Sequence, residues 1–316
     1  MDNTRQHSTN QYVGKFTKLL IDSDIDGMTC AAMILRVFPG LEVHYSGPNI
    51  IQNGKETLAV DEKTIITDLP FIKGCGLYFD HHESNNPGVK FDGVWKEAGS
   101  AAHIVYDYFV GTDGVDLSDF GPFLPILDRF DSGDLTLEDV QKLDFVLKFI
   151  YSTKRVDFDY YNHLIKLLTR EGPAGLQKDY LVAQKIKIIE NDIEMMRAGI
   201  GGAIVRRDPP IVFIDLIDKP FSSVHITMIE EELFDNYIFC AFKKDGNSTT
   251  ARLYDNGLNP EARRADGSRY DLLSVAKKMN STHSGGHRSG CGFTLPSGMS
   301  LKECANALTP LLREVL

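Results

Sequence analysis

The sequence predicts an α/β protein in which a doubly wound, mostly parallel sheet lobe is joined by a helical connector to a smaller, mixed α/β lobe. Strand and helix patterns alternate over residues 16–110, the pattern turns mainly helical over 121–200, and strands return after 203. With 316 residues the chain has room for about two domains, each with its own core. We expect a sheet domain at 15–150, a helical connector at 151–202 and a second domain at 203–316.

The first lobe begins with the apolar run "FTKLLID", which is typical of a buried strand. A helix follows and ends at Pro39 and Gly40, and a later helix has Ser100 as a candidate N-cap. The expected strands are 16–22, 41–47, 62–69 and 75–80, and the expected helices are 27–38 and 99–110. Such alternation indicates parallel strands, and parallel sheets bind ligands at the carboxyl ends of their strands.

A long segment without helix breakers, residues 176–198, has a helical period and stops at the glycine-rich "GIGG". We interpret it as a connecting helix. The strand pattern then resumes in four apolar segments: 203–207, 209–217, 236–244 and 249–255. Helices are expected at 222–234, 270–280 and 300–316.

The net charge of −10 disfavours long duplex DNA as a partner, because such binders need a basic surface to neutralise phosphates. The same net charge is compatible with small anionic ligands, which can be bound through a metal ion or a small basic pocket. No apolar run is long enough for a membrane span, and the first residues lack the apolar core of a signal peptide. The five cysteines are scattered and odd in number, which favours reduced thiols in the cytoplasm. The oligomeric state is left open.

The most informative motif is "DSDIDG", where three acids alternate directly after the first apolar run. In extended backbone, Asp22, Asp24 and Asp26 would point to the same side, where their charges would repel. One or two divalent metal ions would remove that cost, whereas an acidic turn that caps the next helix is the simpler alternative. Three acids before a Gly-led helix favour metal binding.

Further acids end other apolar runs, and parallel strands would bring several of them to one edge. Asp68 ends "TIITD", and Asp80 ends "LYFD" directly before His81 and His82. Carboxylate and imidazole together are typical ligands of Mn, Zn or Fe. The segment "DRFDSGD" adds Asp128 and Asp131 at helical spacing.

A glycine-rich segment near the C-terminus, "STHSGGHRSGCGF", sets a histidine and an arginine among four glycines. Glycines let backbone N–H groups approach an anion, and Arg288 could contact a phosphate through two hydrogen bonds. A loop whose glycines only permit tight turns is the alternative.

In this order, "DSDIDG", "ITD", "DHH", "DRFDSGD" and "SGGHRSGCG" resemble the DHH phosphoesterase superfamily with its DHH-associated C-terminal domain. The resemblance extends from about residue 16 to the end. Members include RecJ-type exonucleases, oligoribonucleases, cyclic-dinucleotide phosphodiesterases, pyrophosphatases and exopolyphosphatases.

The resemblance implies a role for each matching residue. Asp24 would bind one Mn²⁺ and Asp26 the other, with Mg²⁺ or Co²⁺ as alternatives. Asp68 would bridge the two ions, and His81 would complete the second ligand set. The metal candidates are Asp22, Asp24, Asp26, Asp68, His81, Asp128 and Asp131. Many relatives have a histidine where this chain has Asp22, so it stays open whether Asp22 is a ligand. The motif "DSG" matches the family pattern at Asp131, but the apolar run ends at Asp128, so it also stays open which of these two binds metal.

The implied catalytic residues are His82, which would orient the reacting phosphate, and Asp80. Substrate would bind to Gly285, Gly286, His287 and Arg288, and to Arg252 in the strand "TTARLYD". The implied activity is hydrolysis of short oligonucleotides or small nucleotides by in-line attack of a hydroxide activated by two metals. The alternatives are a pyrophosphatase or exopolyphosphatase of the same superfamily, or a nucleotide-binding protein without turnover.

Replacing Arg288 with alanine is expected to weaken substrate binding far more than metal binding. Losing one charge-assisted contact costs about 1.5–3 kcal/mol, or roughly one to two decades in affinity. The loss should be larger for a substrate with a second phosphate than for a simple aryl phosphodiester. Steady-state kinetics of both proteins on the two substrates measure this, and equal losses would exclude a positioning role.

Overall fold

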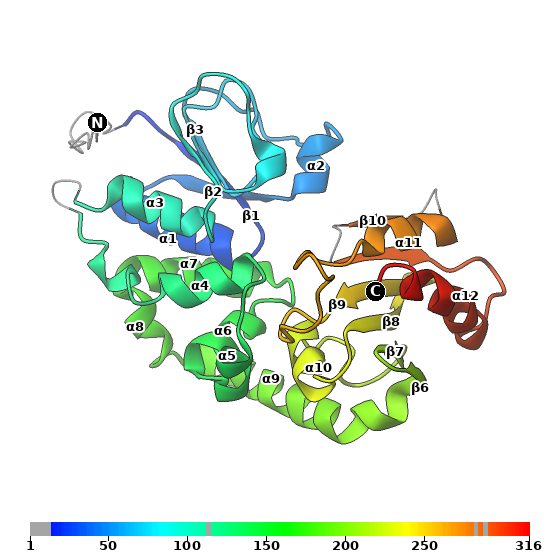
Figure 1. Cartoon of the computed structure of the whole chain (residues 1–316). Helices are drawn as coiled ribbons and strands as arrows, with labels where there is room; N and C mark the ends of the chain where they lie inside the picture. Colours follow the sequence, from blue (N-terminus) through cyan, green and yellow to red (C-terminus); the bar gives the residue numbers. More distant parts are fainter. Residues whose placement is uncertain (1–13, 112–114, 281–283, 287–289) are drawn as a thin grey trace. The chain divides into compact units, whose positions relative to one another are not determined.

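The computed structural model of the chain describes residues 14–111, 115–280, 284–286 and 290–316, and it consists of two compact units (Figure 1). Unit 1 contains the residues up to Asp134 together with Phe145–Ile186. Unit 2 contains Leu135–Asp144 and Lys187–Leu316. The long helix α9 (Tyr180–Gly199) begins in unit 1 and ends in unit 2.

Unit 1 is built on a five-stranded sheet in which every neighbouring pair of strands is parallel. The strand order is β2-β1-β3-β4-β5. The strands are β1 (Lys18–Asp22), β2 (Glu42–Ser46), β3 (Thr64–Thr67), β4 (Leu77–Asp80) and β5 (Gly93–Trp95). The chain passes from β1 outward to β2 and then returns to β3 on the other side of β1. The carboxyl ends of β1 and β3 therefore form the switch point, the position at which such sheets bind ligands.

The central strands are buried on both faces, which explains why their sequences are continuously apolar. Leu19, Leu20 and Ile21 have no exposed surface. Helices α1 (Ile25–Val37) and α3 (Ala101–Phe109) pack on the strands and on each other. A second core cluster, formed by Leu20, Ile66, Leu69 and Tyr78, packs against partly buried side chains that include Ile51 of α2 (Pro48–Gln52).

The region that the sequence predicts as mainly helical consists of several short helices. Those of unit 1 are α4 (Leu124–Asp131), α6 (Phe145–Ser152), α7 (Phe158–Glu171) and α8 (Pro173–Leu176), and α5 (Leu137–Lys142) belongs to unit 2. Helix α7 packs along α1, and the two are seen side by side in Figure 1. Single 3-10 turns are η2 (Glu83–Asn85) and η3 (Ser118–Phe120) in unit 1 and η4 (Ile200–Ala203) in unit 2.

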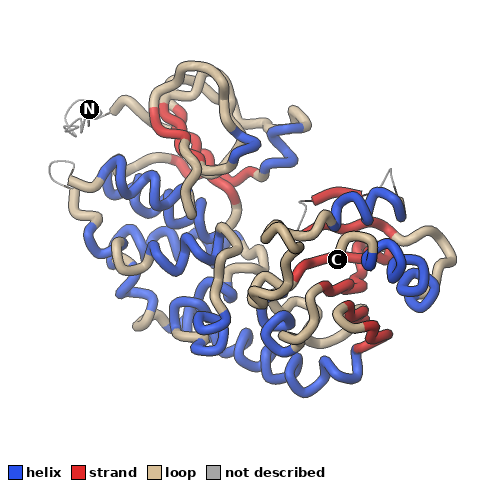
Figure 2. The backbone as a smooth tube through the Cα atoms, viewed as in Figure 1, coloured by secondary structure: helices blue, strands red, loops and turns tan. Residues whose placement is uncertain are grey.

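Unit 2 is built on a mixed six-stranded sheet with the order β10-β11-β9-β8-β7-β6. Its strands are among the red segments of Figure 2. The strands are β6 (Ile204–Asp208), β7 (Ile211–Asp215), β8 (Ile238–Asp245), β9 (Ser248–Asp255), β10 (Ser284–Gly286) and β11 (Gly290–Thr294). Only β7 and β8 pair in parallel among these described strands. The core includes Phe213, Phe242 and Leu253 of the sheet and Leu308 of α12. The helices of this unit beyond α9 are α10 (Ile226–Glu232), α11 (Leu272–Met279) and α12 (Leu301–Arg313).

The predicted class, a parallel-sheet α/β lobe followed by a mixed α/β lobe, is confirmed. Ser100 is the N-cap of α3, as the sequence predicts, because its side chain accepts a hydrogen bond from the His103 N–H. Strand β5 is not predicted by the sequence, because its three residues are too few to show an alternating pattern. None of the described helices combines the length and the apolar character that a membrane crossing requires.

Candidate metal centre

The turn from β1 to α1 places three carboxylates at the switch point of the sheet. Asp22 is the last residue of β1, and Asp24 is the N-cap of α1, where its Oδ1 accepts from the Gly27 N–H at 3.0 Å. The turn is so tight that a Cβ on Gly27 would lie 2.4 Å from the carbonyl oxygen of Asp22. A glycine is therefore required for the strand and the helix to meet at this angle.

Asp26 lies inside α1, is fully buried and faces the beginning of α3. Its Oδ2 accepts from the backbone N–H of Ala101 at 2.7 Å, and its Oδ1 accepts from that of Ala102 at 2.8 Å. The first N–H groups of a helix have no partner within the helix and favour a negative charge. The N-terminus of α3 thus fixes this carboxylate in one orientation and leaves each oxygen a further lone pair.

Asp68 follows β3 and has a left-handed backbone conformation, with φ of 56°. Non-glycine residues rarely adopt this conformation, and those that do occur often at functional sites. The Asp68 N–H still donates to the carbonyl of Phe79 at 2.9 Å, so the bend costs no backbone hydrogen bond. The side chain is only 2% exposed, and its Oδ1 has no hydrogen-bond partner among the described residues.

At the end of β4, Asp80 is occupied by hydrogen-bond donors. Its Oδ2 accepts from the Tyr78 hydroxyl at 2.7 Å. Its Oδ1 accepts from the backbone N–H of His81 at 2.8 Å and lies 2.9 Å from His82 Nδ1. Burial alone would raise the pKa of Asp80, but the hydrogen bonds from His82 and Tyr78 outweigh it and lower the pKa. Asp80 therefore orients the His82 ring and the backbone of His81, and one of its oxygens lies within 4.8 Å of ligand atoms of Asp68, His81 and His82.

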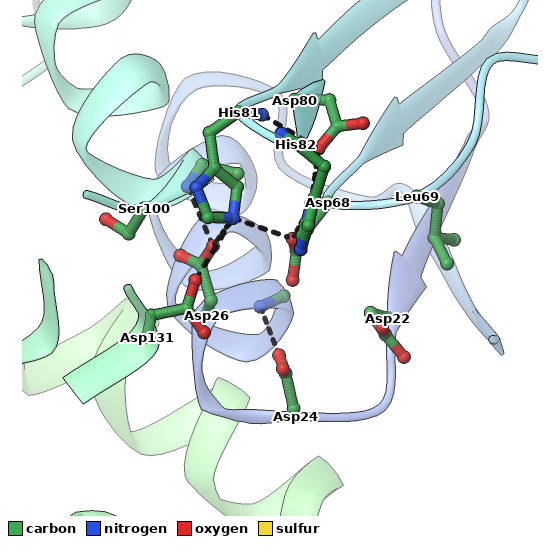
Figure 3. A network of polar contacts seen from close by, with 12 residues as sticks. Asp22, Asp24, Asp26, Asp68, Leu69, Asp80, His81, His82, Ser100 and Asp131 are labelled. Atoms are coloured by element: carbon green, nitrogen blue, oxygen red, sulfur yellow. Dashed lines mark hydrogen bonds and ion pairs between the residues drawn. The ribbon is translucent and has the colours of Figure 1, made fainter. Parts of the chain in front are cut away.

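His81 directs one ring nitrogen at a backbone carbonyl and the other at the acids. Its Nδ1 lies 3.0 Å from the carbonyl oxygen of Ala98, which can only accept, so Nδ1 carries the proton. Its Nε2 lies 3.1 Å from Asp131 Oδ2, 3.6 Å from Asp68 Oδ1 and 3.9 Å from Asp26 Oδ2. This nitrogen is buried and makes no well-directed hydrogen bond within the described part of the chain. Figure 3 shows it in the middle of the carboxylates.

Helix α4 presents its two aspartates to different partners. Asp128 accepts from the Ser100 hydroxyl at 2.6 Å and lies 2.6 Å from His103 Nδ1. Asp131, one helical turn later, faces His81. The sequence leaves open which of the two takes part in the site, and the structure brings Asp131 into the acidic cluster while Asp128 supports the start of α3.

His82 lies at the more exposed side of the cluster, with 45% of its side chain accessible. Its ring packs against that of His81 at 4.1 Å between centroids, and its Nδ1 is 3.6 Å from Asp68 Oδ1. Since Asp80 holds the Nδ1 edge, the Nε2 edge of the ring points away from Asp80. A ligand that reaches the acids from solvent would meet this edge.

The acids are protonated far more readily than free aspartate. Burial, followed by repulsion from Asp24, raises the pKa of Asp22 to about 7. Burial and the charge of Asp131 also raise the pKa values of Asp24 and Asp26, and burial and the charge of Asp26 raise that of Asp68. Burial alone would lower the pKa of His81, but the carboxylates of Asp131 and Asp26 outweigh it and raise the pKa to about 9. The cluster therefore carries more negative charge than its surroundings can neutralise.

These features fit divalent cations. Among the described residues, three groups bring their ligand atoms within 4.8 Å of one another: Asp22, Asp24 and Asp68; Asp26, His81 and Asp131; and Asp68, Asp80, His81 and His82. Asp68 Oδ1 and His81 Nε2 are buried without a hydrogen-bond partner, which is costly unless a cation faces them. Oxygen ligands with one imidazole suit Mn²⁺ or Mg²⁺.

The residues predicted to bind substrate lie in unit 2. Arg252 is in β9, opposite Gly292 of β11, and its side chain is exposed. Gly285 and Gly286 form most of the short strand β10, which pairs with β11. His287 and Arg288 lie outside the described residues.

Two supporting groups were not found from the sequence. The hydroxyl of Tyr78 fixes Asp80, and the carbonyl of Ala98 fixes His81. Tyr78 lies in an apolar run, where a tyrosine normally indicates core packing. A backbone carbonyl leaves no signal in the sequence at all.

Structural comparison identifies the fold. A pGpG-specific phosphodiesterase of Vibrio cholerae superposes with a TM-score of 0.74 at 17% identity, over 95% of this chain and 98% of that chain. The DHH domain of a member of a ribosomal-protein family gives 0.61 at 14% identity, over 96% and 87%. RecJ of Thermus thermophilus in complex with Mn²⁺ gives 0.58 at 15% identity, over 96% of this chain and 53% of RecJ. The chain has the DHH-phosphoesterase fold.

The predicted resemblance to the DHH superfamily is thus confirmed for the fold. No protein-family model and no curated protein matches the sequence. At identities of 14–17%, the solved DHH-fold structures define how the chain folds, and the chemistry must be argued from its own side chains. The matched RecJ has been solved with Mn²⁺ and also with Mg²⁺.

The two aspartates of α4 provide a matched test of the site. Asp131→Asn is expected to weaken Mn²⁺ binding roughly 10- to 100-fold, because the carboxylate faces the metal-binding groups. Asp128→Asn is expected to change the affinity much less and instead to lower the free energy of unfolding by about 1–3 kcal/mol, since it disturbs the partners of Ser100 and His103. Titration calorimetry and denaturant unfolding measure the two effects. Weaker Mn²⁺ binding by Asp128→Asn than by Asp131→Asn would contradict this assignment and make Asp128 the metal ligand.

The metal-free protein is expected to lose stability as the pH rises. The pKa values of Asp22, Asp24, Asp26 and Asp68 are higher in the folded protein than in the unfolded chain. These acids therefore stabilise the fold fully below about pH 4, and the stabilisation is lost as the pH rises through their folded pKa values, of which that of Asp22 is about 7. His81, raised to about 9, acts in the same direction above pH 6.5. Melting temperatures in chelator should therefore fall from pH 5 to 8.5.

Asp68→Asn is the matched variant for this experiment. It removes one buried charge without changing the shape of the side chain, so the metal-free variant should melt above wild type at pH 8. Added Mn²⁺ should stabilise wild type strongly and the variant weakly. A variant that melts below wild type at pH 8 without metal would show that the cluster is not strained by repulsion.

Proposed function

We propose that this protein is a metal-dependent phosphodiesterase that hydrolyses short oligonucleotides or small nucleotides. The observation that carries the proposal is a pair of buried ligand atoms, Asp68 Oδ1 and His81 Nε2, that make no hydrogen bond within the described part of the chain. They lie among carboxylates at the switch point of a DHH fold. Two of the proteins that share this fold are a phosphodiesterase and the exonuclease RecJ.

The cluster has groups for two cations. Asp22, Asp24 and Asp68 would hold one, and Asp26, His81 and Asp131 would hold the other, with Asp68 close enough to His81 to serve both. We assign Mn²⁺ to the site, with Mg²⁺ or Co²⁺ as alternatives. When bound, such ions lower the pKa of water and neutralise charge on phosphate oxygens. This assignment gives Asp22 a ligand role in place of the histidine of many relatives.

The remaining residues of the centre position the metal ligands or bind the substrate. Asp80 accepts from both His82 and Tyr78, so it holds the His82 ring in one orientation, and its role is positioning. His82 is exposed and lies next to Asp68, where its Nε2 can contact a phosphate oxygen of the substrate. The N-terminus of α3 holds the Asp26 carboxylate and so limits the movement of the ligand set.

In unit 2 we assign substrate binding to one face of the sheet. Arg252 is exposed there, and Gly292 lies opposite it on β11. A Cβ at Gly292 would lie 3.0 Å from the carbonyl oxygen of Ala251, so the glycine lets β11 lie close to β9 beside Arg252. A guanidinium suits a second phosphate or a terminal nucleotide. Gly285, Gly286, His287 and Arg288 would contribute to the same function.

A panel of substrates tests the proposal. With Mn²⁺, wild type should cleave dinucleotides and short RNA faster than long duplex DNA, cyclic dinucleotides, 3′-phosphoadenosine 5′-phosphate or pyrophosphate. Asp68→Ala should lower kcat by at least about 100-fold. Mutating a residue that only hydrogen-bonds to a metal ligand typically lowers activity about 10- to 100-fold, and a ligand shared by two ions should matter more. Arg252→Ala should raise KM with little loss of kcat.

Three outcomes would contradict the proposal in different ways. Preference for pyrophosphate or polyphosphate would make the protein a pyrophosphatase or exopolyphosphatase. Binding of nucleotides without turnover under all metals would make it a binding protein. Full activity of Asp68→Ala at saturating Mn²⁺ would place the chemistry elsewhere.

A further inference from the structure

An aromatic cluster that the proposed mechanism does not use lies in unit 1. Tyr45 of β2 packs against Phe158, the first residue of α7, with 5.0 Å between ring centroids. Tyr161, one turn further along α7, lies 6.3 Å from Tyr45 and 6.0 Å from Phe158. The Tyr45 hydroxyl donates to Asn162 Oδ1 at 2.9 Å. We call Tyr45, Phe158 and Tyr161 the aromatic platform.

The platform has a buried side, formed by Tyr161, and a side that is exposed to solvent, formed by Phe158. Tyr161 is only 1% exposed, whereas Phe158 is 48% exposed and the neighbouring Val156 is 64% exposed. The fixed rings of Tyr45 and Tyr161 hold Phe158 so that part of its ring meets water. An exposed aromatic ring on a rigid support is suited to stacking with a flat ligand.

The platform adjoins the acidic cluster. Tyr45 immediately precedes Ser46, which pairs in register with Asp22 at the carboxyl ends of β2 and β1. Burial, followed by the charges of Asp24, Asp157 and Asp22, raises the pKa of Tyr161 to about 12. The aromatic rings and the metal ligands therefore lie at the same edge of the sheet, within one unit.

One basic side chain, Lys154, belongs to the same region of unit 1. Lys154 is exposed, and its Nζ lies 4.5 Å from the centroid of the Phe130 ring, next to Asp131 in sequence. Lys154 directly follows Thr153, whose carbonyl oxygen accepts from the Tyr161 hydroxyl of the platform at 2.6 Å. An exposed cation beside a residue that holds the platform suits the phosphate of a ligand whose flat part stacks on Phe158.

We propose that the aromatic platform binds a nucleobase of the substrate by stacking on Phe158, with Lys154 facing the adjacent phosphate. This inference rests on the proposed function, and it makes the metal-bearing unit itself selective for nucleotides over inorganic polyphosphates. The Asn162 amide nitrogen carries two N–H donors beside the platform, which suit acceptors on the edge of the base.

Fluorescence measures stacking without any turnover. A mononucleotide of 2-aminopurine, added in Mg²⁺ because Mn²⁺ itself quenches fluorescence, should be quenched by wild type. Phe158→Ala should weaken its binding about tenfold or more, since stacking on one aromatic side chain is worth roughly 1–3 kcal/mol per base. Phe158→Trp should restore it. Tyr180→Ala is the control, because Tyr180 is a 76% exposed aromatic residue of the same unit that is not part of the platform.

Kinetics supply the second arm. Phe158→Ala should raise KM about tenfold for a dinucleotide and leave it unchanged for the matching abasic dinucleotide, which has no base to stack. Equal losses on both substrates, or no quenching by wild type, would overturn the platform. So would self-association of wild type that Phe158→Ala abolishes, because the ring would then belong to an interface between copies. If wild type quenches 2-aminopurine but hydrolyses nothing, the proposed function fails while the platform stands.

Discussion

The structure of unit 1 depends on one unfavourable interaction, the mutual repulsion of carboxylates at the carboxyl ends of β1 and β3. Asp26 and Asp68 are almost fully buried, and their charges act on each other. Such an arrangement is costly without a cation, and the protein retains it at the position where the strand order reverses. The fold thus accepts a local loss of stability that bound metal would recover.

Backbone groups keep the acids in place against that repulsion. Two N–H groups of α3 hold Asp26, and the close contact of Gly27 with Asp22 fixes the angle at which α1 leaves the sheet. Asp80 holds the His82 ring and the backbone N–H of His81, and the Ala98 carbonyl holds the His81 ring. The same device serves the platform, where the buried Tyr161 supports the exposed Phe158. In each case a buried, rigid element holds a charged or apolar side chain in an orientation that is unfavourable by itself.

The sequence was sufficient where the signal is local. Alternating acids after an apolar run indicated the β1–α1 turn, and the two-lobe class followed from the order of the segments. It was insufficient where contacts are distant. The motif "DSG" pointed to Asp131 and the end of the apolar run pointed to Asp128, and only the packing of α4 shows that Asp131 meets His81. The roles of Tyr78 and the Ala98 carbonyl likewise depend on tertiary contacts. The platform joins β2 to a helix more than a hundred residues later, which no sequence period reveals.

The central claim is that the acidic cluster holds a pair of divalent ions that share Asp68. Crystals grown with Mn²⁺ and measured at the manganese absorption edge test it most directly. The account predicts two anomalous peaks about 3.5–4 Å apart, one beside Asp22 and Asp24, the other beside Asp26, His81 and Asp131, with Asp68 in contact with both. A single peak, or peaks that leave Asp68 without a metal contact, would contradict it.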